Sequence, residues 1–495
     1  MEKLNFGETK FFKLGNFSEG IKNDENNLIF PTNFAKNSYN FNFLGGSLKT
    51  GLGFKNFVIY YTFLGFNLQK TMTIPQKVVD IEKFWFFKKW DISRTTYLYY
   101  LMIYTLNDDD SKSIFWAPIE STIDFFLENT RMTFTKAPII KIIRINGIEY
   151  FLLVPTQKGD HMYLWDGEEV FSYPIFSNVS DFEVFNGRYF GLTKDDNQQI
   201  YLTTRDLSYW LTGLVDGQTI SLLNERGALN KIIAYGTTLY LIRDYGITAL
   251  TPAEQIEDFK IKDLSKTSSK IYGETAVLCG DKILMLCDDG LYAFDGIDME
   301  KLNLGFESCL KDVDNNSSFA CFSNGKYYLS FRSFDNSKSN SIALEDNKNN
   351  SLLELDINTN KYSLMCGVCV KDMINYFYKT PEKIIALFDG NNNFGELCYN
   401  GKIFDTATKK VWESVETDFG TITTKTLKSV TLKSLHPLKL IVYVDDKKYE
   451  FNIKNSEKMQ KINTNLKGLK FVISFESLSC DACVSDVCLE VLMWT

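Results

Sequence analysis

The chain has 495 residues, of which 44% are hydrophobic and 23% are charged, so it can bury a large core and is not a disordered protein. Phenylalanine, tyrosine and tryptophan make up 15% of the residues, which favours strands over helices. A formal net charge of −8 excludes a protein that grips nucleic acid through a basic surface. It leaves open a protein that surrounds DNA without holding it.

The sequence shows no segment that would enter a membrane. The amino terminus lacks the apolar stretch of a secretory signal, and no run approaches the ~18 apolar residues that a membrane helix needs. The best candidate, residues 97–104, is short and predicts a buried strand. We therefore expect a soluble protein that is made in a cytoplasm and has no membrane partner.

The first predicted unit, residues 1–50, is rich in Asn and Phe and has little periodicity, which is typical of an extended arm. Its aromatic side chains would either be buried against a neighbouring subunit or belong to a terminal strand that completes a sheet of the same chain. The sequence favours neither alternative. The candidate interaction residues are Phe11, Phe12, Phe30, Phe41 and Phe43.

One pattern recurs between about residues 85 and 400: a strand, a tight turn with a glycine, and a second strand. Asn-Gly and Gly-Asp suit hairpin turns because they tolerate positive φ. A period near 40–50 residues with several strands per unit is typical of β-propeller blades. With two weaker flanking units, the pattern predicts an irregular propeller of about seven blades. The turn glycines are Gly147, Gly187, Gly236, Gly280 and Gly325.

Two segments inside the propeller differ from this pattern. The polar run at 335–350 predicts an exposed insertion, and residues 253–264 predict one short helix. Near the start, predicted strands at 58–63 and 71–74 fit either the propeller or the arm.

From about residue 405 the pattern changes to alternating strands separated by short polar turns, which predicts a β-sandwich. The expected organisation is all-β. It comprises an amino-terminal arm at 1–50, a β-propeller at 51–402 and a carboxy-terminal β-sandwich at 403–495.

Two pairs of cysteines have the CxxC spacing that can present two thiolates to zinc. They are Cys366 with Cys369, and Cys480 with Cys483. The pairs lie too far apart in the sequence for an ordinary zinc ribbon, and their flanks resemble strands. We expect small buried residues of a reduced protein, with a zinc site as the alternative, and no cofactor.

The sequence offers no clear catalytic set. The two histidines, His161 and His436, both lie in predicted turns. Paired carboxylates could hydrolyse a glycoside, but the aspartates at the blade turns are also the residues that hairpin turns prefer. We therefore expect no enzyme. These aspartates are Asp109, Asp166, Asp196, Asp295 and Asp389.

Two segments and the order of the domains carry a resemblance. Residues 33–37 (Asn-Phe-Ala-Lys-Asn) precede a Gly-Ser-Leu-Lys-Thr-Gly sequence at 46–51, and residues 199–210 are a strand that runs into a tryptophan corner. In these features, and in the order arm, propeller and sandwich, the chain resembles the β-propeller tail-hub proteins of short-tailed bacteriophages. These include packaged-DNA stabilisation proteins and tail tubular (nozzle) proteins. The tryptophan corner has Leu207 and Ser208 where Asp-Pro is usual.

The resemblance implies a structural virion protein that is assembled in the host cytoplasm. It implies a homo-oligomer, a hexamer in the relatives, that forms a ring below the portal and adaptor, retains packaged DNA and provides the ejection channel. The partners would be the portal, the adaptor, other tail proteins and double-stranded DNA that passes without sequence-specific contact. The alternative is a glycan-binding or glycoside-active propeller that acts as a receptor-binding module.

Overall fold

The computed structural model describes most of the chain, and it confirms the predicted all-β class. Strands and short 3-10 helices form the regular structure of this part, with no α-helix among the described residues. Most of the predicted insertion at 335–350 lies outside them, as do Phe30 and Phe43. The described residues are 7–14, 17, 35–42, 45–173, 178–204, 207–212, 217–310, 313–333, 348–378, 381–390 and 392–493.

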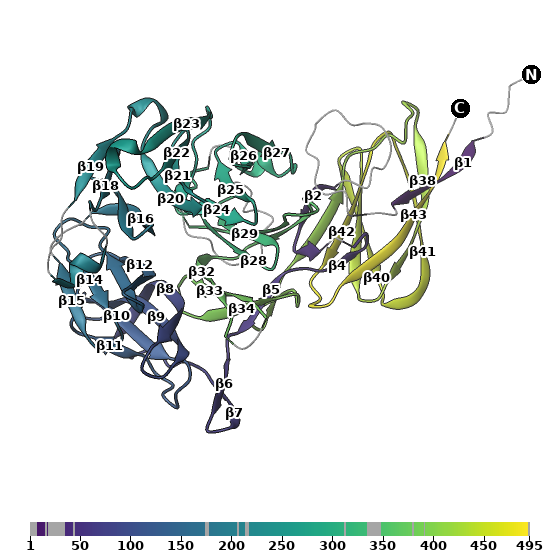
Figure 1. Ribbon diagram of the computed structural model, residues 1–495. Helices are drawn as coiled ribbons and strands as arrows, with labels where there is room; N and C mark the ends of the chain where they lie inside the picture. Colours follow the sequence, from purple (N-terminus) through teal and green to yellow (C-terminus); the bar gives the residue numbers. More distant parts are fainter. Residues whose placement is uncertain are drawn as a thin grey trace, which may run out of the picture.

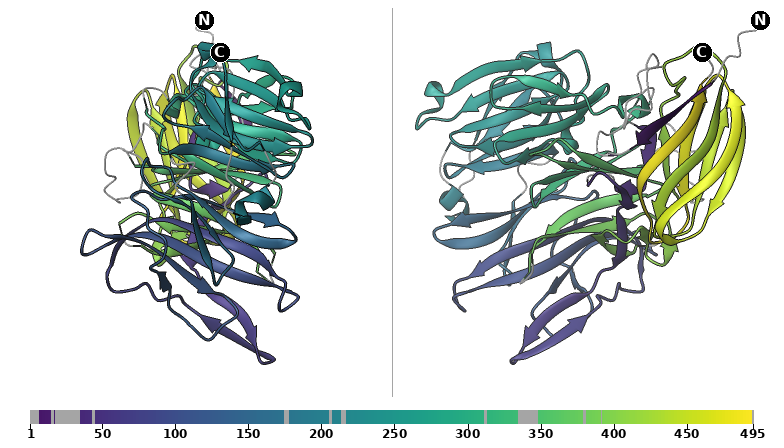
Figure 2. Two further views of the ribbon diagram at one scale, coloured as in Figure 1. Left: turned by 60° about the vertical axis from the view of Figure 1, so that its left-hand side comes forward. Right: turned by 90° about the vertical axis from the view of Figure 1, so that its right-hand side faces the viewer.

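Seven largely antiparallel sheets follow one another around a closed ring and form the predicted β-propeller (Figures 1 and 2). Blades one to six each have four strands in sequence order. The first two are β8 (Val78–Asp91), β9 (Thr96–Asn107), β10 (Lys112–Pro118) and β11 (Leu127–Asn129), then β12 (Ile139–Ile145), β13 (Ile148–Val154), β14 (Met162–Trp165) and β15 (Val170–Tyr173). The next two are β16 (Val179–Phe185), β17 (Arg188–Thr193), β18 (Gln199–Leu202) and β19 (Gln218–Ser221), then β20 (Leu229–Tyr235), β21 (Thr238–Arg243), β22 (Gly246–Thr251) and β23 (Lys260–Lys266).

The last three blades complete the ring. Blade five has β24 (Val277–Cys279), β25 (Lys282–Cys287), β26 (Gly290–Phe294) and β27 (Met299–Leu302), and blade six has β28 (Phe319–Ser323), β29 (Lys326–Phe331), β30 (Ser351–Asp356) and β31 (Tyr362–Cys366). Blade seven is made of β32 (Val370–Tyr376), β33 (Lys383–Phe388), β34 (Phe394–Cys398), β5 (Gly53–Asn56), β35 (Lys402–Ile403) and β36 (Thr406–Ala407).

The turn glycines lie where the period predicts them. Each connects the first and second strands of a blade, from blade two to blade six, with φ between 62° and 84°. This left-handed conformation is accessible to glycine without strain, which is why the pattern was visible in the sequence.

Blade seven contains strands from both ends of the propeller. The early strand β5 pairs antiparallel with β34, and the later strand β35 pairs with β5. The first strands of blades one and seven, β8 and β32, contact each other, so the ring closes at this junction. Because β36 belongs to the same sheet, the propeller continues past the predicted boundary at residue 402.

Two sheets face each other in the sandwich. One has the order β3 (Phe41–Asn42), β4 (Leu48–Thr50), β43 (Cys483–Met493), β38 (Lys425–Ser434) and β41 (Ser456–Gly468), and β1 (Glu8–Leu14) also pairs with β43. The other has the order β2 (Ala35–Tyr39), β37 (Lys410–Ser414), β42 (Phe471–Ser477), β39 (Leu438–Val444) and β40 (Lys447–Ile453).

The amino-terminal segment is extended, as predicted, and its described strands β1 to β4 all belong to this sandwich. The sequence left open whether this segment packs against a neighbouring subunit or completes a sheet of its own chain. Its described strands complete sheets of their own chain.

One hydrophobic core spans the sandwich and two blades of the propeller. It joins buried residues of blades five and six, such as Leu286 and Leu329, to sandwich residues such as Leu440 and Leu489. Asn40 strengthens the junction, because its side chain donates to the carbonyl of Lys409 at 2.6 Å and accepts from the amide of Cys366 at 3.0 Å. The two units therefore form one body without an exposed linker between them.

Candidate functional site

The predicted aromatic residues that the structure describes lie on the sandwich, not on one common surface. Phe41 is fully buried in the shared core. Phe12 is partly buried, and its ring lies 4.9 Å from that of Phe419. Of the three described residues, Phe11 is the most accessible to a partner, at 68% exposed. Phe30 and Phe43 lie outside the described residues.

The CxxC cysteines are not brought into a metal site. Cys366 ends β31 in blade six and Cys369 follows it, whereas Cys483 begins β43 and Cys480 precedes that strand. The structure describes all four, and within its described part no group of three His, Cys, Asp or Glu residues could hold a metal ion. No disulfide joins the ten cysteines, all of which the structure describes, and these four are partly exposed rather than buried as expected.

Four of the five turn aspartates bind the backbone of their own turns, namely Asp109, Asp166, Asp196 and Asp295. The fifth, Asp389, pairs with Lys348 at 2.8 Å. Asp166 accepts from the amides of Glu168 and Glu169 at 2.8 and 2.7 Å, and Asp295 accepts from two amides in the same way. Each lies in a different blade. These contacts explain why aspartate occurs there, since such bonds stabilise tight turns.

A cluster that the sequence analysis missed lies on the axis of the propeller. Lys83 on β8 pairs with Asp372 on β32, with 3.2 Å between Nζ and the carboxylate oxygen. Lys231 on β20 pairs in the same way with Glu274 at 3.1 Å. These four residues line a channel cavity of about 450 Å³ between the first strands of several blades. A signal existed in the sequence for one member: Lys231 is the single charged residue of the first strand β20, whereas β8 and β32 carry several charged residues.

The charges in this channel compensate one another. Burial lowers the pKa of Lys231, but the carboxylates of Glu274 and Asp181 outweigh it, so its pKa lies above the ordinary value. The ammonium group of Lys231 holds the pKa of Glu274 below its ordinary value. A general acid or base works best with a pKa near the operating pH. Both shifts move the pKa values of Lys231 and Glu274 away from neutral pH. The two residues are therefore better suited to a structural ion pair than to proton transfer.

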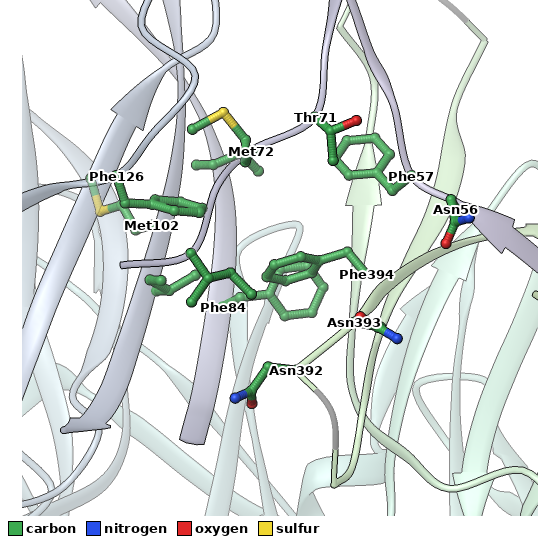
Figure 3. A pocket seen from close by; sticks show the side chains of 13 residues that line it. Asn56, Phe57, Thr71, Met72, Phe84, Met102, Phe126, Asn392, Asn393 and Phe394 are labelled. Atoms are coloured by element: carbon green, nitrogen blue, oxygen red, sulfur yellow. The ribbon is translucent and has the colours of Figure 1, made fainter. Parts of the chain in front are cut away.

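An apolar pocket lies where the propeller closes (Figure 3). Its volume is about 250 Å³, and its buried wall includes Phe84, Met102 and Phe126. Exposed polar residues, Asn56 and Thr71 among them, also line it. An apolar cavity with a few polar groups around it is the usual form of a binding pocket.

A hairpin projects from the body beside this pocket. It consists of β6 (Ile59–Phe63) and β7 (Phe66–Lys70), and it reaches beyond the blades in the views of Figures 1 and 2. At its base the amide of Phe57 donates to the carbonyl of Phe394 in blade seven at 3.0 Å. The buried ammonium of Lys70 donates to carbonyls of blade one, including those of Ser121 at 2.9 Å and Ile123 at 2.7 Å. The base is therefore anchored on both closing blades.

The far end of the hairpin is apolar and exposed. Leu64 is 82% exposed and Phe66 is 70% exposed. Residues 57–69 include no charged side chain. Among the described residues the hairpin is a two-stranded sheet without a further strand. Such a hairpin is only marginally stable in water unless it packs against something, so this surface is suited to a partner.

Comparisons with known proteins identify no family. No family model matches the chain, and no curated protein matches it. Solved structures with a similar fold include an ancestral GH74 enzyme (8% identity, TM-score 0.43, covering 77% of this chain and 58% of that chain). They also include the extracellular domain of the putative hybrid two component system BT4673 from B. thetaiotaomicron (11%, 0.42, 92% and 64%) and the Neurospora crassa Pan2 WD40 domain (9%, 0.37, 62% and 87%). These likenesses concern the fold alone, which rests on the sheet topology described above.

The structure also bears on membrane association. Within its described part, no helix is long and apolar enough to span a bilayer.

Proposed function

We propose that the chain is a structural, non-enzymatic subunit of a short-tailed phage tail. Several copies form a ring below the portal and adaptor, retain the packaged DNA and line its exit path. One observation carries this proposal: a single rigid propeller–sandwich body bears a projecting hairpin whose exposed end is apolar and uncharged. This combination suits a building block, since rigid bodies hold a shape and apolar projections join copies.

The shared core supports the mechanical part of this role. A ring that holds DNA under pressure needs subunits that do not bend between their units. Here the apolar core continues from blades five and six into the sandwich, and strands β2 and β3 lie next to β31 and β37.

The charge distribution supports passage of DNA between copies rather than through a propeller. Lys83, Lys231 and their carboxylate partners occupy the axis of the propeller. The net charge of −8 offers no excess of cations that would hold the duplex. Since each phosphate contact made by a basic side chain adds salt-dependent affinity, a ring wall without such an excess lets DNA slide.

The role can be tested in the phage that encodes this chain. We expect heads made without it to fill with DNA and then lose it, so that purified heads contain less nuclease-protected DNA than wild-type heads. Adding the purified chain to nascent heads should restore retention. If heads without the chain kept their DNA and lost only adsorption to host glycans, the receptor-binding alternative would replace this proposal.

A further inference from the structure

The apolar hairpin and the apolar junction pocket are complementary features of one molecule. The hairpin end carries Leu64 and Phe66, and neither it nor the lining of the pocket contains a charged side chain. A cavity of about 150 Å³ lined by apolar side chains is enough to bind benzene. The pocket of about 250 Å³ can therefore accept the phenyl ring of Phe66.

The same hairpin cannot fill this pocket itself. Its base, including Phe57, and the adjacent Thr71 and Met72 line the pocket, whereas its end points away from the body (Figures 1 and 3). A projection at one place and a cavity at another generate a head-to-tail contact between identical chains, which closes into a ring when the rotation allows.

The turn of the hairpin is costly to fold, which is consistent with a binding role. Leu64 has φ 49° and Gly65 has φ 84°, as in a two-residue type I′ turn. Asparagine is the preferred residue at the first of these positions, and leucine there is strained. An exposed, strained leucine contributes nothing visible to the stability of the chain itself.

We propose that the hairpin end of one copy inserts into the junction pocket of a second copy, with Phe66 and Leu64 as the inserted side chains. This inference rests on the proposed ring and names its contact. The absence of Lys and Arg from residues 57–69 disfavours an anionic membrane as the occupant, because surface-binding segments attract such lipids through basic residues.

The test uses full-length variants and sedimentation of the purified chain. We expect Leu64→Asn and Phe66→Ser to weaken self-association by at least about tenfold, since each loses the burial of a large apolar side chain. Leu64→Asn should keep or raise the melting temperature, because asparagine suits the turn. Thr71→Trp should fill the pocket and weaken association equally. Ile422→Ser, at a sandwich residue that is 93% exposed, is the matched control and should change nothing.

A cross-link identifies the contact directly. A photoreactive benzoylphenylalanine at position 66 should attach to peptides around Thr71 or Phe394 of another copy, as shown by mixing isotope-labelled and unlabelled chains. Attachment to any other surface, or normal rings from all three variants, would overturn the inference and leave the proposed ring intact. Co-sedimentation with phosphatidylglycerol vesicles that depends on Leu64 and Phe66 would assign the hairpin to a lipid surface instead. A chain that never self-associates would refute both proposals.

Discussion

Two buried aspartates show how single residues order the propeller. Asp181 in blade three and Asp372 in blade seven each follow a bulge in a first strand. Each accepts from its own following amide and from an amide of the next blade, that of Ile232 at 3.0 Å and that of Phe84 at 3.2 Å. Each carboxylate thus ties two neighbouring blades together at the axis.

Replacing either aspartate by alanine should destabilise the chain. Asp181→Ala and Asp372→Ala leave buried amides without their acceptor, and Asp372→Ala also removes the partner of Lys83. We expect each to lower the free energy of unfolding by about 2–4 kcal/mol. Urea denaturation measures this loss. Asp109→Ala, which changes a solvent-exposed turn, serves as the control and should have a far smaller effect. Equal effects at all three positions would contradict the role assigned to the buried pair.

A buried lysine makes stability depend on pH. Lys410 is fully buried and donates to the carbonyl of Ser479 at 2.7 Å. Burial lowers its pKa from 10.5 to about 8, despite the nearby Cys480 and Asp481. Between these two values the unfolded chain holds a proton that the folded chain has lost, so the free energy of unfolding rises as the pH rises through this window.

The test compares the free energy of unfolding of the wild type with that of Lys410→Met, both measured by urea denaturation. The difference between the two free energies should increase by up to about 3 kcal/mol between pH 8 and pH 10.5. Subtracting the variant removes the contribution of other groups, including Lys70, whose pKa burial also lowers to about 8. A difference that does not change with pH would show that Lys410 keeps its ordinary pKa in the folded chain.

At the scale of elements, the sequence predicts strands and turns best where neighbouring residues alone determine the backbone conformation. The five turn glycines are recognisable because the first hairpin of each blade needs positive φ. The predicted helix at 253–264 is wrong. This segment contains one short 3-10 helix, η4 (Ile256–Asp258), and then the start of strand β23. β23 is the outermost strand of blade four, and its exposed polar residues resemble those of a surface helix.

Other strands form only by pairing with strands that are distant in the sequence. The local pattern of residues does not reveal them. Strand β41 is polar along its length and was not predicted, because it is an edge strand held by β38. Strand β5 joins blade seven only because β34, far along the chain, offers its edge. The pocket and the channel have the same origin, since their residues come from blades that meet only when the ring closes.

The amino-terminal strands give a further test at this scale. Phe41 is fully buried in the shared core, so Phe41→Ala should lower the free energy of unfolding by about 3–5 kcal/mol. Phe11→Ala, on the same segment but exposed, should stay within about 0.5 kcal/mol. Thermal or urea unfolding distinguishes them. A small effect at Phe41 would mean that the arm is not part of the sandwich core.

At the scale of the whole molecule, the chain combines a rigid body with a projecting apolar hairpin. The shared core fixes the sandwich against blades five and six, whereas the hairpin is anchored only at its base on blades one and seven. The projection therefore lies on a different part of the propeller from the sandwich (Figure 1). Contacts through the hairpin and through the sandwich would hold each copy against its neighbours and against other tail proteins.

The most direct test of this account is the mass of the purified full-length chain at micromolar concentration, measured with negative-stain images of the same sample. We expect a closed ring of identical copies, which docks below the portal when the portal–adaptor complex is added. A monomer at every concentration that also ignores the portal–adaptor complex would contradict the account.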